Sequence, residues 1–384
     1  MSTKIWNVGV VGYGFSAKIF HIPFINHVHG MKVYGIVQRT PKPDDDAEAD
    51  YLGVKLYRTA EDMMKDPAIE VVIVTTAPAS HFALSKLALE AGKHVVCEKP
   101  FTPTSREADV LIALARECGK LLSIYHNIIA DRRWDADYVT LSKLINNGSL
   151  GRITEFETHF DHHLPTPPDP EAHKWRNKIV PGASAVYDLG VHLLDQALHL
   201  FGPPTEITGF IGSDREVNDS GFDDSFTILL HYTKGLKVTA KGTVVSPEDE
   251  QLRFWVRGDT GSFKKFHLDI QEHQLRAGIM PSESIFGLEP SERYGMLMEF
   301  RLYVKSGISL TFFQGTLTNF HDGNYTKKVV SAAEPLTYTQ FYRQLVAALA
   351  GDGEVPVSGE DGRRVIHLLE LAYESSRTRR TLSV

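Results

Sequence analysis

The chain has 384 residues, of which 42% are hydrophobic and 23% are charged, a composition typical of a folded globular protein. Its formal net charge of −7 disfavours a general nucleic-acid binder, and two cysteines cannot form a disulfide framework or a cysteine-rich zinc site. No apolar run approaches the roughly 20 residues of a membrane-spanning helix. The first residues lack an apolar signal segment, so we expect a cytoplasmic protein, and the length indicates two domains.

Short apolar strands alternate with helices through the first third of the sequence. The expected strands cover residues 6–11, 31–37, 71–75, 94–97 and 121–125. Helices are expected at 82–91 and 106–118. This alternation predicts a parallel sheet, and the nearly continuous apolar character of the strands indicates burial of both sheet faces.

A glycine-rich segment, Gly12-Tyr13-Gly14-Phe15-Ser16-Ala17, follows the first strand and opens a helix. It has the G-x-G-x-x-A pattern of a dinucleotide-binding loop. The first glycine permits a tight turn, the second lets a pyrophosphate approach the backbone, and the small Ala17 allows helix and strand to pack closely. An ordinary structural turn is the alternative.

The end of the second strand, Gln38-Arg39-Thr40, predicts which cofactor binds. An acidic residue here would bind the ribose 2′-hydroxyl of NAD, whereas Arg39 and Thr40 suit a 2′-phosphate. We therefore expect NADP(H), with NAD(H) possible. Asp44 to Asp46 follow closely, and a loop that folds back would weaken this inference.

Glu98-Lys99-Pro100 stands at the carboxyl end of an expected parallel strand, the edge where such sheets bind ligands. A lysine at this edge can hold a substrate hydroxyl or donate a proton. An exposed loop lysine is the plain alternative, but the strand-end position favours a functional role for Lys99.

The pattern changes after about residue 150. Longer strands are expected at 152–160, 206–211, 225–232, 236–245 and 251–256, and short turns between several of them indicate a largely antiparallel sheet. Helices are expected at 185–200, 338–350 and 359–376. We place a dinucleotide-binding domain at 1–127 and a substrate-binding and oligomerisation domain at 128–384, with terminal helices able to pack on either.

Two clusters of polar side chains lie in this second part. His159-Phe160-Asp161-His162-His163 ends a strand, and we expect His159 and Asp161 to line the substrate pocket rather than to bind a metal. In the helix at 185–200, Asp188 and His192 are four residues apart and share a face, with Asp195 nearby. A histidine beside a carboxylate is a candidate general base, and a hydrogen-bonded core histidine is the alternative.

Together these residues resemble the Gfo/Idh/MocA oxidoreductase family, which includes glucose–fructose oxidoreductase and inositol dehydrogenases. The matching pieces are Gly12-Tyr13-Gly14, Glu98-Lys99-Pro100, Trp175-Arg176 and Asp188-Leu189-Gly190-Val191-His192. The segments 12–15, 20–23, 258–263, 268–272 and 276–278 are similar to the branch that contains NADP-dependent scyllo-inositol dehydrogenases.

The resemblance implies an α/β protein with an N-terminal Rossmann domain. It implies a C-terminal α/β domain, built on a large, mostly antiparallel open sheet through which a homodimer or homotetramer forms. Lys99 would assist at the substrate hydroxyl, His192 would be the acid/base, and Asp188 would orient His192 or bind substrate. The residues implied at the cofactor are Thr75, Pro78, His81, Glu98, Lys99, Asn127, Trp175 and Arg176, with Arg176 also at the substrate. One departure is the segment 128–131, which separates Asn127 from Arg132-Arg133-Trp134-Asp135.

We therefore expect hydride transfer between NADP(H) and a carbinol or ketone carbon of a sugar, inositol or related polyol. Two other functions stay open: a non-catalytic dinucleotide-binding regulator similar to galactose-pathway repressors, and a reductase of a non-carbohydrate ketone or an imine. Lys99 and His192 favour an enzyme, because a regulator needs neither. The expected partner is a small molecule, without nucleic acid, membrane or metal.

Overall fold

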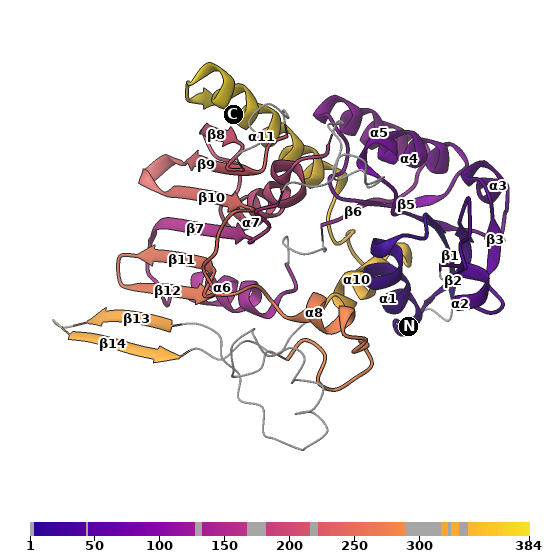
Figure 1. Cartoon of the computed structure of the whole chain (residues 1–384), viewed down its shortest axis with the longest axis horizontal. Helices are drawn as coiled ribbons and strands as arrows, with labels where there is room; N and C mark the ends of the chain where they lie inside the picture. The colour runs from indigo at the N-terminus through magenta and orange to yellow at the C-terminus, as the bar shows by residue number, and fades with distance from the viewer. Residues whose placement is uncertain are drawn as a thin grey trace.

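The computed structural model describes residues 4–43, 45–126, 133–166, 182–215, 222–288, 316–321, 324–329 and 337–384. Two sheets, each accompanied by helices, lie side by side (Figure 1). The first belongs to a Rossmann-type unit and the second to an α/β unit, so the predicted fold class is confirmed. No helix of the described residues is long and apolar enough to cross a membrane.

The first sheet has six parallel strands in the order β3-β2-β1-β4-β5-β6. Their bounds are β1 (Trp6–Val11), β2 (Met31–Val37), β3 (Lys55–Tyr57), β4 (Val71–Val74), β5 (His94–Glu98) and β6 (Leu122–Tyr125). The strand order reverses between β1 and β4. Because ligands bind beyond the carboxyl ends of the strands at such a switch point, the edge after β1, β4 and β5 is the expected site.

Helices connect these strands, as the alternation predicts. They are the π-helical turn η1 (Ala17–His21), α1 (Ile22–His27), α2 (Ala47–Asp50), α3 (Ala60–Met64), the 3₁₀ turn η2 (Pro78–Ser80), α4 (His81–Glu90) and α5 (Ser105–Glu117). The helix α5 begins at a capping box, in which the Thr104 side chain and Glu107 satisfy each other's backbone N–H groups.

The second sheet has nine strands in the order β14-β13-β12-β11-β7-β10-β9-β8-β15. All neighbours are antiparallel except β7 and β10. The bounds are β7 (Ile153–Asp161), β8 (Glu206–Gly212), β9 (Ser225–His231), β10 (Lys237–Thr243), β11 (Leu252–Gly258), β12 (Gly261–Phe266), β13 (Thr316–His321), β14 (Asn324–Val329) and β15 (Leu382–Ser383).

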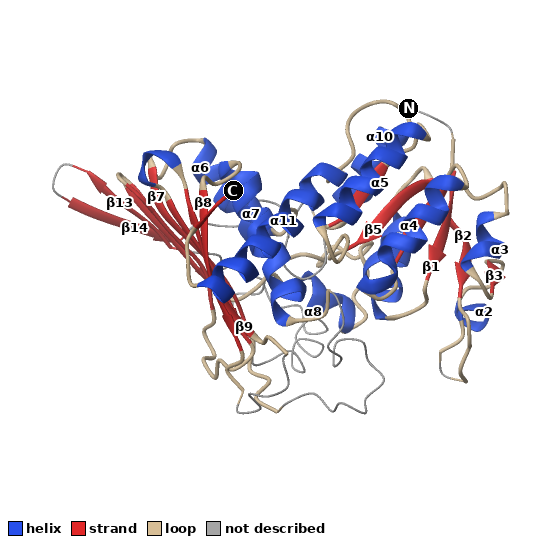
Figure 2. Ribbon diagram, turned by 90° about the horizontal axis from the view of Figure 1, so that it is seen from above, coloured by secondary structure: helices blue, strands red, loops and turns tan. Residues whose placement is uncertain are grey.

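Helices lie on one face of this sheet (Figure 2). The further helical segments are α6 (Ala136–Asn146), the π-helical turn η4 (Val186–Gly190), α7 (Val191–Phe201), the 3₁₀ turn η5 (Thr233–Gly235), α8 (Gln271–Arg276), α10 (Thr339–Leu349) and α11 (Gly359–Thr378). Alternate residues of β7 make the covered face: Phe156 and Phe160 are fully buried, and Thr158 donates to Gln196 of α7 at 3.0 Å.

The C-terminal segment joins the two units. Its helix α10 contacts α1, and the Val357 carbonyl accepts hydrogen bonds from the Ile124 N–H at 3.1 Å and the Ser123 hydroxyl at 2.9 Å, at the β6 edge of the first sheet. From there α11 runs along α5 of the first unit and on to β8 and α7 of the second. One 20-residue helix therefore contacts both units.

Candidate active site

The glycine loop has the backbone shape that its sequence predicts. Gly12 has φ +105°, and a Cβ atom there would lie 2.9 Å from the Thr75 Oγ1 atom. Ala17 is fully buried where the following turn packs on the sheet. A Cβ atom on Gly14 would meet nothing within 4 Å, so open space lies beside that backbone. These features fit a bound dinucleotide pyrophosphate.

The Thr75 side chain braces this loop. Its hydroxyl donates to the carbonyls of Val11 at 3.0 Å and Gly12 at 3.2 Å. Phe15 is 42% exposed beside the loop, and the Arg276 guanidinium of α8 stacks 4.5 Å from its ring centroid. Arg276 belongs to one of the segments that resemble the scyllo-inositol dehydrogenase branch, but its position beside the glycine loop could not be predicted from the sequence.

Glu98 is buried and connects the glycine loop to Lys99. Its carboxylate accepts hydrogen bonds from the Ser16 hydroxyl, from His21 Nε2 at 2.7 Å and from the Lys99 backbone N–H at 3.1 Å. Burial opposes its ionisation, but the hydrogen bond and charge of His21 and the Ser16 hydroxyl lower the pKa of Glu98. Tyr342 of α10 contacts His21 Nδ1 at 2.6 Å, a partner that the sequence did not indicate.

His81 is also buried, between the loops that follow β4 and β5. Its Nδ1 lies 2.8 Å from the Pro100 carbonyl oxygen, and its Nε2 lies 3.0 Å from that of Thr76. Because a carbonyl only accepts, both nitrogens donate, as in an imidazolium. Burial lowers the pKa of His81, but the Cys97 sulfur and these carbonyls outweigh burial and raise it to about 9.

Arg39 and Thr40 lie exposed at the carboxyl end of β2. The Gln38 amide folds the next loop back, because its Nε2 donates to the Asp45 carbonyl at 2.6 Å and its Oε1 accepts from the Ala47 N–H at 2.9 Å. The Asp45 carboxylate itself is paired with Lys18 at 2.7 Å.

Arg58 is a second cation at the same strand end. It donates to the Gln38 carbonyl at 3.1 Å from the residue after β3. The sequence did not indicate this contact, because β3 is too short to be predicted.

Lys99 meets Asp188 across the junction of the two units. Its ammonium donates to the Asp188 carboxylate at 2.6 Å and to the Asp188 backbone carbonyl at 2.8 Å. The lysine side chain is only 4% exposed and that of Asp188 is 28% exposed. Gly182 lies beside Pro100, the residue after Lys99: a Cβ atom on Gly182 would meet Pro78 at 3.0 Å and Pro100 at 3.7 Å.

His192 lies fully buried at the start of α7, with its ring 6.4 Å from the Phe160 ring centroid. The predicted helix at 185–200 consists of a π-helical turn, Val186–Gly190, followed by α7. Asp188 lies in the turn and His192 in the helix. Such π-helical turns occur frequently at functional sites.

Two other predicted groupings have partners other than His192. The two Asp195 carboxylate oxygens accept from Arg133 Nε at 2.8 Å and Nη2 at 2.7 Å, with His126 at 3.7 Å. His159 and Asp161 contact each other at 3.5 Å on the face of β7 opposite to Phe160, which packs against His192. Strand alternation therefore separates both residues from the His192 side.

Three predicted site residues, Asn127, Trp175 and Arg176, lie outside the described residues, as does the segment 128–131. Among the described residues, no group of three or more histidine, cysteine or acidic side chains is placed to hold a metal ion.

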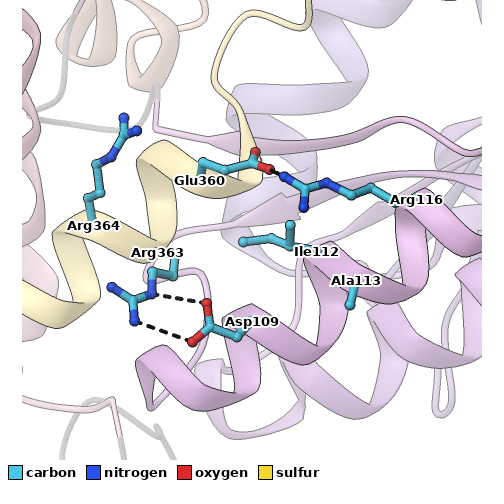
Figure 3. Close-up of a pocket in the computed structure, with 7 residues that line it drawn as sticks. All are labelled: Asp109, Ile112, Ala113, Arg116, Glu360, Arg363 and Arg364. Atoms are coloured by element: carbon cyan, nitrogen blue, oxygen red, sulfur yellow. Dashed lines mark hydrogen bonds and ion pairs between the residues drawn. The ribbon is translucent and has the colours of Figure 1, made fainter.

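A hollow between α5 and the first turns of α11 contains none of the predicted residues (Figure 3). Its lining consists of Asp109, Ile112, Ala113, Arg116, Glu360, Arg363 and Arg364. Each of its three guanidinium groups is paired with a carboxylate of this chain: Arg363 with Asp109 at 3.0 and 3.3 Å, Arg116 with Glu360, and Arg364 with Asp361 at 3.2 Å. We interpret it as a contact between the units rather than an anion site.

Comparison with known proteins identifies the family. Residues 6–126 match the model of the oxidoreductase family's NAD-binding Rossmann fold, and residues 142–384 match that of its C-terminal alpha/beta domain. The chain belongs to the Gfo/Idh/MocA oxidoreductase family.

Relatives of this Gfo/Idh/MocA oxidoreductase match over nearly its full length. The scyllo-inositol 2-dehydrogenase (NADP(+)) IolW of Bacillus subtilis is 33% identical, covering 98% of this chain and 95% of IolW. The oxidoreductase YdgJ of Escherichia coli is 36% identical, covering 100% and 99%. The solved structure of yvaA from Bacillus subtilis superposes with a TM-score of 0.87 at 32% identity, covering 100% and 99%.

Proposed function

We propose that this oxidoreductase transfers a hydride between NADP(H) and a carbinol or ketone carbon of a sugar, inositol or related polyol. The observation that carries the proposal is the Lys99–Asp188 contact at 2.6 Å, at the edge of the sheet that also holds the glycine loop. The NADP dependence and inositol substrate named for IolW support the same choice.

In this proposal each residue has a distinct task. The backbone around Gly12 and Gly14 would hold the pyrophosphate of a dinucleotide, which would supply the hydride chemistry. Lys99, whose side chain is only 4% exposed, donates a hydrogen bond to the substrate oxygen and stabilises the negative charge that develops there. Asp188 holds the Lys99 ammonium in place, and His192 exchanges the hydroxyl proton.

The test is nicotinamide absorbance with purified protein, NADP+ or NAD+, and a panel of inositols, aldoses and polyols, with NADPH and the matching ketones in reverse. We expect turnover with NADP. We expect Lys99→Met to lower kcat by about 10²- to 10³-fold, because it removes one transition-state donor, and to leave the Kd of NADPH nearly unchanged. Tight NADPH binding without any turnover would favour a regulator, and an unaltered kcat would remove Lys99 from the mechanism.

The choice of NADP rests on the cations at the end of β2. Arg39 and Arg58 lie there, and the nearby Asp45 carboxylate is neutralised by Lys18. We expect Arg39→Ala to raise the Kd of NADPH about 10- to 100-fold, since charge-assisted hydrogen bonds contribute about 1.5–3 kcal/mol. The Kd of NADH should not change. Arg152→Ala, an exposed arginine of the second unit, is the control in the same titration. Equal weakening of both cofactors would contradict the assignment.

We also propose that the chain forms a homodimer or homotetramer through the nine-stranded sheet. Its helix-free face carries Phe210, which is 61% exposed, together with Leu229 and Trp255. Exposed apolar side chains on an uncovered sheet face are a common sign of a protein interface.

A further inference from the structure

The C-terminal helix α11 contacts both loops that carry the Lys99–Asp188 pair. On one side, the Glu370 carboxylate accepts from the Ser105 backbone N–H at 2.8 Å and its hydroxyl at 2.6 Å. On the other, the Tyr373 hydroxyl lies 2.9 Å from Ser184 Oγ. Ser105 follows Lys99 by six residues, and Ser184 precedes Asp188 by four. Glu370 and Tyr373 are three residues apart and share one helix face.

Tyr187 adds a direct connection next to Asp188. Its ring stacks on that of Tyr373, with centroids 5.9 Å apart and planes at 28°. Its hydroxyl donates to the Pro103 carbonyl, in the loop after Lys99, at 3.2 Å. Burial and the nearby charge of Glu370 raise the pKa of Tyr187 to about 12, so it remains a hydrogen-bond donor at neutral pH.

The helix itself is held firmly on the second unit. The Ser375 hydroxyl accepts from the Gly209 N–H of β8 at 2.9 Å, and a Cβ atom on Gly209 would lie 2.2 Å from the Ala372 carbonyl oxygen. The Tyr373 hydroxyl also hydrogen-bonds the Asp223 carboxylate, and the Asp223 carbonyl accepts from the Ala185 N–H at 3.0 Å.

The first unit approaches the same helix just as closely. A Cβ atom on Gly362 would lie 2.7 Å from the Ile124 side chain and 3.2 Å from that of Phe101. Close packing of this kind resists relative displacement of the packed elements. The helix α11 is therefore a fixed reference for both loops.

The Lys99 side chain must be held in one geometry for the proposed chemistry. It loses about 2 kcal/mol of rotamer entropy when it is held in this way, and Lys99 and Asp188 belong to different units. An error of about 1 Å in placing a reacting group can lower a rate about 10²-fold. We propose that Glu370, Tyr373 and Tyr187 are positioning residues that fix Lys99 against Asp188. The inference rests on the proposed function, because it gives that pair its chemical role.

The first test is Tyr373→Phe, which keeps the ring on Tyr187 and removes the hydroxyl. We expect kcat to fall about tenfold, with the Kd of NADPH unchanged. Tyr232→Phe is the matched control, since that hydroxyl donates to the Gly202 carbonyl at 3.0 Å, at the far end of α7, and kcat should not change. Glu370→Ala should act like Tyr373→Phe, whereas Glu370→Gln keeps an acceptor for Ser105 and should restore most of the rate.

A double-mutant cycle separates positioning from a general structural effect. In an Asp188→Asn background, we expect Tyr373→Phe to have little further effect on kcat, because both changes act on the same pair. A full additional tenfold loss in that background would overturn the proposal.

The second readout needs no turnover. In ¹⁵N-lysine-labelled protein, the Lys99 ammonium resonance is assigned by its loss in Lys99→Met. We expect Tyr373→Phe to shift this resonance and Tyr232→Phe to leave it in place. If no substrate of the panel reacts but the resonance shifts, the proposed function fails and the positioning role stands. If Tyr373→Phe moves neither kcat nor the resonance, the positioning role is refuted.

Discussion

At the scale of single residues, the protonation of the His81 ring decides whether it can hydrogen-bond two loops of the candidate site at once. Its two hydrogen bonds hold the loop at Thr76 to the loop at Pro100, next to Lys99. Only the imidazolium makes both bonds. Its pKa of about 9 in the folded protein exceeds the ordinary value of 6.5. The stabilisation is therefore complete below about pH 6.5 and is lost as the pH rises through 9.

We expect this linkage to be measurable by urea unfolding. A shift from 6.5 to about 9 corresponds to about 3 kcal/mol. Between about pH 6 and pH 10, wild-type protein should lose about 3 kcal/mol more of its unfolding free energy than His81→Asn. His94→Asn is the control of opposite sign: burial and the charges of Lys120 and Lys4 lower the pKa of His94 from 6.5 to about 4, so this group makes the folded protein more stable, not less, as the pH rises through 6.5. Equal pH dependence of wild type and His81→Asn would contradict the imidazolium assignment.

At the scale of elements, local patterns identify most strands of the first unit. Runs of valine and isoleucine mark β1, β2, β4 and β5 to within a residue or two, because both sheet faces are buried. The strand β3 could not be predicted, because it has three residues and exposes Lys55. The strand β12 lacks a regular alternation of apolar and polar residues, because a lysine occupies a buried position beside a second lysine. This buried residue, Lys265, donates to the Phe266 and His267 carbonyls.

In the candidate site, some positions could be predicted from the sequence, whereas the contacts between distant residues could not. The position of Lys99 at the sheet edge could be predicted, because the carboxyl ends of parallel strands meet at one edge whatever lies between them. The partners of the site residues could not be predicted, because they come from distant segments. Arg133 binds Asp195, 62 residues away, and Tyr342 contacts His21, 321 residues away. No spacing or periodicity records such a pairing. It follows from the packing of the two units.

At the scale of the whole molecule, the uncovered sheet face governs the proposed assembly. Leu229 lies on this face in β9, at a position that alternates with the buried Ile228 and Leu230. We expect wild-type protein to sediment as a multiple of its 42.9 kDa mass, and Leu229→Lys to sediment as the monomer. Leu52→Lys is the matched control on the first unit, where Leu52 is already 92% exposed. A wild-type monomer at micromolar concentration would contradict the proposed assembly.

The pairing of Val357 with β6 also has a consequence for synthesis on the ribosome. The nucleotide-binding sheet is assembled from the first third of the sequence, yet the groups at its β6 edge find their partner more than 200 residues later. Domains generally fold from the N-terminus as the chain emerges. Here the β6 edge of the first unit lacks its final partner until almost all of the second unit has been synthesised. We therefore expect the first unit to complete its β6 edge only after Val357 has been synthesised.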